Sequence, residues 1–261
     1  MDLKENQEKF LTYDRVHPWE TARLGFVERL LRKYNPGAKK VLDVGCGNCF
    51  VASSLAKKSQ VQVAAVDSMF TPELTAQLRE QLTGQQMEFF SSVEEIRDTA
   101  FDTVMLLDVI EHIENEEAAF LELLNSSKVM PGAVFIITVP AFSLLFSDHD
   151  RKLEHHRRYN VGQLCRLAGE NGAEIIDYGY FFISLLFIRV LHIICEKLFC
   201  REKNKSVSAV GEWNKSSLVT SIVVFCLKTD TLITRCLRKI KIIIPGLSCY
   251  LVCRKPLLRK K

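Results

Sequence analysis

Short apolar runs alternate with longer amphipathic segments along most of the chain. Runs with the length and composition of buried strands occur at residues 40–44, 63–66, 87–90, 101–108, 133–140 and 174–180. Helical periodicity occupies residues 18–34, 51–58, 72–82 and 116–130, with a Pro131-Gly132 turn after the last of them. Strands that alternate with helices at this spacing predict an α/β fold with a doubly wound, mostly parallel sheet.

The first two apolar runs carry features of a nucleoside-binding site. The first contains Asp43 and is followed by Gly45-Cys46-Gly47, and the second ends at Asp67. Glycines allow the backbone to approach a ligand that a Cβ atom would block. A carboxylate at the end of the second strand is placed to accept hydrogen bonds from a ribose diol. The sequence therefore predicts a nucleoside-like cofactor.

The details of the glycine loop favour one cofactor. A dinucleotide site requires a third glycine at position 50, which is Phe50, and the Gly-Lys-Ser/Thr of a phosphate-binding loop is absent. Asp43, two residues before Gly45, would repel a pyrophosphate but suits a positively charged ligand. S-adenosylmethionine carries a sulfonium, an ammonium and an adenosine, and it has no phosphate.

With these residues the sequence resembles the class I S-adenosylmethionine-dependent methyltransferases, whose first motif reads acid-x-Gly-x-Gly-x-Gly. Cys49 stands at the third glycine here. The resemblance extends over residues 18–180 and includes the Phe101-Asp102 start of the fourth strand and Glu111-His112 after it. It implies a Rossmann-like sheet of seven strands, the last of them antiparallel and formed by residues 248–256.

The resemblance also implies which residues bind the cofactor. They lie at the ends of the first four strands: Asp43, Val44, Gly45, Cys46, Gly47, Asp67, Ser68, Ser92, Val93, Asp108 and Val109. Ser92 stands where the family usually has an acid that contacts adenine.

A densely charged segment, residues 148–160, follows the fifth strand. It resembles the His-Asp…His-x-Arg-Arg-Tyr segment of bacterial methyltransferases that are encoded among genes for lipid-linked glycans. The candidate catalytic residues are His149, His155, Arg158 and Tyr159. Either histidine could act as a general base and the arginine could hold an anionic group of the acceptor. The alternative is a solvated loop. No metal is expected, since neither these histidines nor Cys46-x-x-Cys49 has a diagnostic spacing.

Charge is distributed unevenly along the chain. Residues 1–186 hold 19 Lys and Arg against 27 Asp and Glu, whereas residues 187–261 hold 16 against 4. A basic, apolar tail favours an anionic membrane surface as partner. Nucleic acid is disfavoured because the charges accompany aliphatic runs rather than spaced aromatic residues. Nine cysteines and the absence of a signal-peptide core predict a cytoplasmic protein at the inner face of a membrane.

The predicted domain organisation has four parts. They are an N-terminal helical cap at 1–36, a cofactor-binding core at 37–182, a helical insert at 183–245, and a final strand with a basic tail at 246–261. Charges interrupt the apolar runs of the insert, and residues 217–227 give only about eleven apolar positions. A spanning helix needs about 20. We expect the insert to lie on a membrane without crossing it, or to cover the active site.

These observations predict an O-methyltransferase that acts on a lipid-linked, glycan or other membrane-partitioned small molecule. A quinone-precursor methylase is the alternative, since Asp108-x-x-Glu111-His112 also occurs there. A hypothesis of another class is a non-catalytic, S-adenosylmethionine-binding scaffold at the membrane, which the departures at Cys49 and Ser92 keep open.

Overall fold

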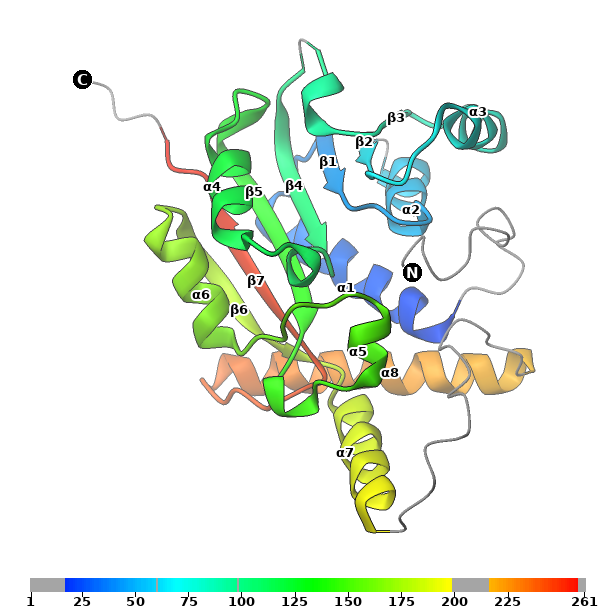
Figure 1. Ribbon diagram of the computed structural model, residues 1–261, viewed down its shortest axis with the longest axis vertical. Helices are drawn as coiled ribbons and strands as arrows, with labels where there is room; N and C mark the ends of the chain where they lie inside the picture. The colour runs from blue at the N-terminus through cyan, green and yellow to red at the C-terminus, as the bar shows by residue number, and fades with distance from the viewer. Residues whose placement is uncertain (1–16, 60, 98, 199–215, 258–261) are drawn as a thin grey trace.

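A seven-stranded sheet forms the centre of the molecule, with the order β3-β2-β1-β4-β5-β7-β6 (Figure 1). The computed structural model describes residues 17–59, 61–97, 99–198 and 216–257. The strands are β1 (Lys40–Val44), β2 (Gln62–Val66), β3 (Met87–Phe90), β4 (Phe101–Leu107), β5 (Val129–Pro140), β6 (Glu174–Phe181) and β7 (Ser248–Arg254). Only β7 runs antiparallel to its neighbours. The predicted doubly wound, mostly parallel sheet is confirmed.

The order of the strands reverses at β1, which pairs with β2 on one side and with β4 on the other. In an open α/β sheet, ligands bind outside the carboxyl ends of the strands at such a reversal. The registers Val44↔Val66 and Val44↔Leu106 bring the ends of β1, β2 and β4 to one edge. This carboxyl edge is where the fold itself places a binding site.

Helices cover both faces of the sheet. One face carries α1 (Pro18–Tyr34), α2 (Phe50–Ser59), α3 (Pro72–Gln81) and part of α8 (Ser217–Lys239), and the other carries α4 (Glu116–Asn125) and α6 (Val161–Glu170). In Figure 1, α4 and α6 lie in front of the sheet and α1 passes behind it. Each face has its own apolar cluster, so β4 and β5 are buried from both sides.

Local sequence signals fix where several helices begin. Pro18 opens α1 after His17, whose Nδ1 accepts from the Trp19 amide at 3.1 Å. Asn160 caps α6 in a capping box with Gln163. Two boundaries differ by several residues from the prediction: α4 ends at Asn125, and β5 begins at Val129, so Pro131-Gly132 lies inside the strand span rather than in a turn before it. The β4–β5 register shifts beside this point, which accommodates the proline.

The C-terminal insert contains two helices within the described residues, α7 (Ile183–Leu198) and α8. Residues 1–16 of the predicted cap, 199–215 of the insert and 258–261 of the basic tail lie outside the described residues. The apolar run at residues 217–227 forms the first half of α8, which continues past Lys228 and Asp230 to Lys239. By length and composition α8 is the one helix among the described residues that could cross a membrane, which is weak evidence. Its second half packs against α1, with Leu227, Thr231 and Thr234 buried.

Both insert helices expose large apolar side chains. Figure 1 shows α7 projecting away from the sheet, and Phe187 on it is 66% exposed. Phe225 on α8 is 71% exposed. The other strongly exposed apolar side chains of the pair include Ile188, Leu191, Leu218, Ile222 and Leu232. This many large apolar side chains exposed on two neighbouring helices favours a protein or membrane interaction site.

Candidate active site at the carboxyl edge of the sheet

The loop between β1 and α2 requires its glycines for steric reasons. Gly45 and Gly47 have φ of +68° and +54°, a region that side chains disfavour. The amides of Gly45 and Cys46 donate to the Val66 carbonyl at 2.8 and 3.1 Å, which holds the loop against the end of β2. A Cβ atom on Gly45 would lie 2.5 Å from Cγ2 of Val109. The loop therefore lies in close contact with Val109, two residues after the end of β4.

Cys49 takes over the conformation of the missing third glycine, with a φ of +57° and a fully buried side chain. Its Sγ lies 3.6 Å from that of Cys46. Burial and the neighbouring thiol raise the pKa of Cys46. The departure from the family motif thus keeps the backbone shape of the loop and adds a buried thiol beneath it.

Two backbone amides orient the carboxylate of Asp67 at the end of β2. Gly47 donates to Oδ2 at 2.9 Å and Met69 donates to Oδ1 at 3.0 Å. Each carboxylate oxygen can accept further hydrogen bonds, as a ribose diol requires. Ser68, next in the chain, is exposed.

Asp43 is almost completely buried, with 2% of its surface exposed, and its Oδ1 has no hydrogen-bond partner among the described residues. Burial raises the pKa of Asp43 to about 7, an effect that Arg23 opposes and Asp67 reinforces. An unpaired buried carboxylate is costly unless a positive group neutralises it. The chemistry of this position fits a cationic ligand.

Residues in the first half of α1 also lie at the carboxyl edge of the sheet. Asp108, at a φ of +58° after β4, accepts from Arg23 Nη1 at 2.6 Å and from Thr138 Oγ1 at 3.2 Å. The Arg23 guanidinium also lies 4.3 Å from the centre of the Trp19 ring. Neither Trp19 nor Arg23 belongs to a sequence motif, so neither was predicted as a site residue.

The remaining predicted cofactor residues also lie at strand ends. Val44, Val93 and Val109 are partly buried against the apolar cluster on the α4–α6 face. Ser92 is partly exposed, just after β3. The structure thus brings the predicted set to the ends of β1, β2, β3 and β4, and its role in binding stays a prediction.

Asp150 organises the charged segment after β5. It is fully buried on α5 (Asp148–Lys152), and its Oδ1 pairs with His155 Nδ1 at 3.0 Å and accepts from Arg158 Nε at 2.7 Å. Burial works against ionisation, but hydrogen bonds from His155, Arg158 and Ser147 hold the pKa of Asp150 well below its usual range. The ionised carboxylate fixes the orientation of the His155 ring.

The other candidate catalytic residues of this segment have different surroundings. Arg158 is buried, and its Nη1 donates to the Ala141 carbonyl at 3.2 Å. Tyr159 is also buried, and its hydroxyl donates to the Ile110 carbonyl at 3.4 Å. Burial raises the pKa of Tyr159. His149 is partly exposed on α5. Among the four, His155 combines partial exposure with a defined acidic partner.

His155 lies beside two residues that follow β4. Its ring meets that of His112 edge to face, with centroids 4.5 Å apart. Potential ligand atoms of Glu111, His112 and His155 lie within 4.8 Å of one another, which suits a divalent cation. Glu111 is fully buried with both carboxylate oxygens unpartnered among the described residues, and burial and Asp108 raise its pKa. Glu111 and His112 entered the sequence prediction only as part of a family motif with Asp108, and neither was among the candidate site residues.

The sheet order, the glycine loop and the acids at the strand ends define an α/β protein with a nucleoside-cofactor site. A family model described as a methyltransferase domain matches residues 19–178, more than half of the chain. The chain belongs to this family, the class I S-adenosylmethionine-dependent methyltransferases. The predicted enzyme class is confirmed.

Known relatives include ubiquinone biosynthesis O-methyltransferases. The protein of Rickettsia felis is 32% identical over 127 residues, which cover 47% of this chain and 51% of that protein. The mitochondrial protein of Schizosaccharomyces pombe is 29% identical over 136 residues, which cover 50% and 48%. The similarity thus spans about half the length of these relatives.

Solved structures share the fold at low identity. Haemonchus contortus phosphoethanolamine N-methyltransferase 2, in complex with S-adenosyl-L-methionine, has a TM-score of 0.57 and 17% identity, covering 95% of this chain and 56% of that one. The [4+2]-cyclase SpnF has a TM-score of 0.54 and 15% identity, covering 89% and 81%. Because a cyclase and a methyltransferase share it, the fold alone does not specify the reaction.

Proposed function

We propose that the protein transfers the methyl group of S-adenosylmethionine to a hydroxyl oxygen of a small molecule that partitions into a membrane. The observation that carries this proposal is the His155 imidazole, held by buried Asp150 beside the Glu111-His112 pair. It supplies a base that is suited to a hydroxyl acceptor, at the same edge of the sheet as the glycine loop.

The carboxyl edge provides the groups that the donor requires. We assign Asp67 to the ribose hydroxyls and Asp43 to the positively charged methionine end of the donor. Gly45 and Gly47 let the backbone approach the ligand. S-adenosylmethionine supplies an electrophilic methyl carbon and leaves as a neutral thioether, so the protein chiefly orients donor and acceptor.

We assign the general base to His155. Its Nδ1 is committed to Asp150, which leaves Nε2 for the acceptor proton. As the new oxygen–carbon bond forms and the carbon–sulfur bond breaks, the hydroxyl proton passes to the ring, and ionised Asp150 stabilises the resulting imidazolium. Arg158 enters this scheme as a positioning residue, because its guanidinium holds Asp150. Tyr159 anchors the segment, and His149 is a second candidate at its exposed end.

Two observations favour an apolar acceptor. The relatives quoted above are named for O-methylation in ubiquinone biosynthesis, which favours a phenolic quinone precursor. The exposed apolar faces of α7 and α8 favour attachment to a membrane where such a molecule resides. Within our proposal a lipid-linked glycan is the second acceptor class, supported by the resemblance of residues 148–160 to methyltransferases of that kind.

The Glu111-His112-His155 cluster supports a metal-assisted variant of the same reaction. A divalent cation held there would lower the pKa of a bound hydroxyl and pair with the buried Glu111 carboxylate. In that case His155 would be a ligand rather than the base. Chelation with EDTA followed by return of Mg²⁺ or Zn²⁺ separates the two mechanisms, because only the metal-assisted one loses and regains turnover.

The test is a transfer assay with methyl-labelled S-adenosylmethionine, the full-length protein and vesicles that contain either a phenolic quinone precursor or a lipid-linked glycan. We expect label in the phenolic acceptor. His155→Ala should reduce turnover by about 10²–10⁴-fold, the usual contribution of a general base, while donor affinity stays near wild type. His156→Ala is the matched control, since that neighbouring side chain is exposed.

Other outcomes have defined meanings. Label in the glycan alone would replace the first acceptor class with the second. Equal turnover of the His155→Ala and His156→Ala variants would refute the base assignment. Donor binding without transfer to any tested acceptor, in an assay with metal supplied, would favour a non-catalytic scaffold.

A further inference from the structure

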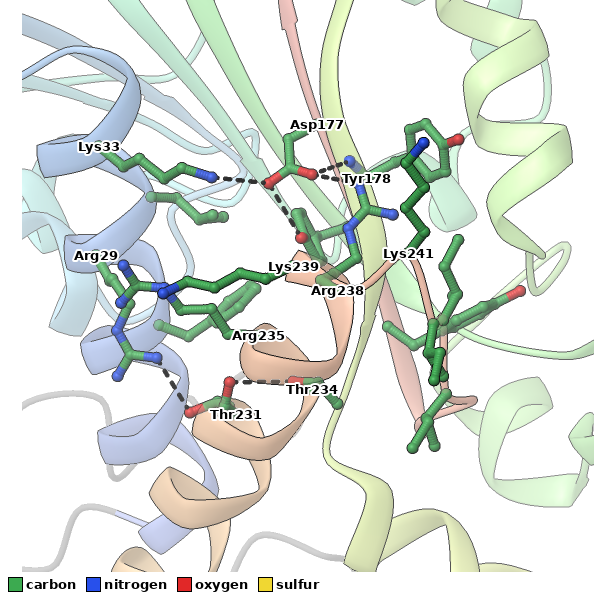
Figure 2. Close-up of a pocket in the computed structure, with 17 residues that line it drawn as sticks. Arg29, Lys33, Asp177, Tyr178, Thr231, Thr234, Arg235, Arg238, Lys239 and Lys241 are labelled. Carbon is green, nitrogen blue, oxygen red and sulfur yellow. Dashed lines mark hydrogen bonds and ion pairs between the residues drawn. The ribbon is translucent and has the colours of Figure 1, made fainter.

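A pocket of about 510 Å³ lies between α1, α8 and the β6–β7 end of the sheet (Figure 2). We call it the lateral pocket. Its α1 residues come from the second half of that helix, including Arg29 and Lys33, whereas Trp19 and Arg23 of the first half face the cofactor edge. Its floor includes Asp177, which lies midway along the edge strand β6 and pairs there with Val252 of β7. The lateral pocket is therefore distinct from the carboxyl edge.

The charge of the lateral pocket is strongly unbalanced. Six of its lining residues are cations: Arg29, Lys33, Arg235, Arg238, Lys239 and Lys241. Asp177 is the one acid among the lining residues, and it is already engaged. Arg238 pairs with it, Lys33 Nζ lies 3.5 Å from Oδ2, and Tyr250 donates to Oδ2 at 3.3 Å. The Asp177 carboxylate can therefore form few further hydrogen bonds or ion pairs with the other cations.

Four cations remain without an ion pair in the described part of the chain. Arg29 donates to the Thr231 hydroxyl at 3.4 Å, and Figure 2 shows it gathered with Arg235 and Lys239 between α1 and α8. Burial and the charges of Arg235 and Arg32 lower the pKa of Arg29. Like charges that crowd around a cavity repel one another unless an anion neutralises them. The lateral pocket is thus complementary to an anionic ligand.

Apolar groups line the same cavity. Phe26, Leu30 and the run Ile242-Ile243-Ile244 form part of its wall. Ile240, Ile242 and Ile243 are also exposed to solvent beside the basic side chains. On α8, Leu232 and Phe225 are exposed as well. A small inorganic anion would leave these apolar side chains uncovered, whereas an amphiphile would neutralise the cations and cover the isoleucines together.

We propose that the lateral pocket binds the phosphate ester of an anionic phospholipid headgroup, with the acyl chains lying along α8 and the isoleucine run. Arginine pairs with phosphate through two parallel hydrogen bonds, and Arg29 and Arg235 are the residues placed to do so. This inference depends on the membrane attachment proposed above but not on methyl transfer. It would hold the protein on the membrane through a face separate from the cofactor edge.

The experiment compares two doubly substituted variants of the full-length protein that lose the same net charge. Arg29→Gln/Arg235→Gln removes two pocket cations, and Lys57→Gln/Arg79→Gln removes two exposed cations on α2 and α3. Binding is measured by sedimentation with phosphatidylglycerol vesicles. We expect the pocket variant to bind at least about tenfold more weakly, and the control variant to bind nearly as wild type does. S-adenosylmethionine affinity, unchanged in both, reports that they fold.

A second arm identifies the source of the phosphate by calorimetry with short-chain phosphatidylglycerol, glycerol phosphate and inorganic phosphate. We expect the lipid to bind most tightly and its binding to be lost in the pocket variant. Equal affinity for lipid and inorganic phosphate would overturn the lipid assignment in favour of a free-phosphate site. Equal loss of vesicle binding in both variants would show general charge attraction and would overturn the site, while leaving membrane attachment and methyl transfer standing.

Discussion

The carboxyl edge of the sheet and the lateral pocket are opposite in charge. At the carboxyl edge, the acids Asp43, Asp67, Asp108 and Glu111 outnumber the two described arginines that act on them, Arg23 and Arg158. In the lateral pocket, six cations surround a single acid. Such an excess of one charge sign is not expected in a region that only supports the fold, because uncompensated charge in a partly buried site destabilises the folded protein. We infer from this difference that the acidic carboxyl edge is suited to a cationic ligand and the basic lateral pocket to an anionic one.

The largest expected effect concerns the fit of the glycine loop at the carboxyl edge. Gly45→Ala places a Cβ atom against Val109 at a positive φ, so we expect affinity for S-adenosylmethionine to fall by about 2–4 kcal/mol. Adding Val109→Ala removes the contacting methyl groups and should restore part of the loss. Gly84→Ala is the control, since it has a positive φ but nothing within 4 Å of its Cβ position. Calorimetry measures all four proteins, and an unaffected Gly45→Ala variant would refute the close approach.

The next effect tests the acid that holds the loop. Asp67→Ala removes the acceptor of the Gly47 and Met69 amides as well as the proposed ribose contact. We expect binding to weaken by about 1.5–3 kcal/mol per charged hydrogen bond lost. Glu80→Ala, at an exposed acid on α3, is the control for loss of charge. Unchanged donor affinity in calorimetry would remove the ribose assignment.

A smaller effect follows from the raised pKa of Asp43, about 7. Below that pH the carboxyl group is protonated in the free protein, and a cationic donor binds the ionised form better. Affinity should therefore fall by up to about tenfold for each pH unit below 7 and level off above it. Binding near pH 6 should also release a proton, which titrations in two buffers of different ionisation enthalpy detect. Asp43→Asn should abolish the pH dependence; if the slope persisted, another group would be responsible.

The smallest expected effect concerns the thermal stability of variants in the basic lateral pocket. Arg29→Gln/Arg235→Gln relieves repulsion in the empty lateral pocket, so thermal stability at low salt should rise by about 0.5 kcal/mol or slightly more. High salt should erase the gain because it screens the repulsion. Lys57→Gln/Arg79→Gln should leave the melting temperature unchanged. A loss of stability in the pocket variant would show that its arginines support the fold.

The sequence predicted the carboxyl edge well because its residues follow one another along strands. Asp43, Gly45 and Asp67 belong to a continuous strand–loop–helix–strand unit, so the sequence motif directly gives their location in the fold. Arg23 was not predictable, because it reaches Asp108 from a helix 85 positions earlier in the chain. Asp150 lies in the charged segment at 148–160 that the sequence singled out, but only the fold shows that it is buried and shared by His155 and Arg158.

The lateral pocket was not predictable as a site. Its cations come from α1, from the end of α8 and from Lys241 just after it, and only the packing of those two helices brings Arg29 and Arg235 together. The sequence showed the basic tail and its aliphatic runs, and it predicted an anionic surface as partner. Helix α8 extends beyond the apolar run at residues 217–227, because Lys228 and Asp230 interrupt that run without ending the helix. Side-chain charge is a weaker helix-ending signal than proline or glycine.

The most direct test of the central claim is ultraviolet cross-linking of methyl-labelled S-adenosylmethionine to the wild-type protein, followed by peptide mapping. The acidic carboxyl edge should hold the donor, so label is expected in peptides that contain residues 43–49 or Asp67, and unlabelled donor in excess should remove it. Label in the peptides of the lateral pocket, residues 231–244, or the absence of any competable label, would contradict the assignment.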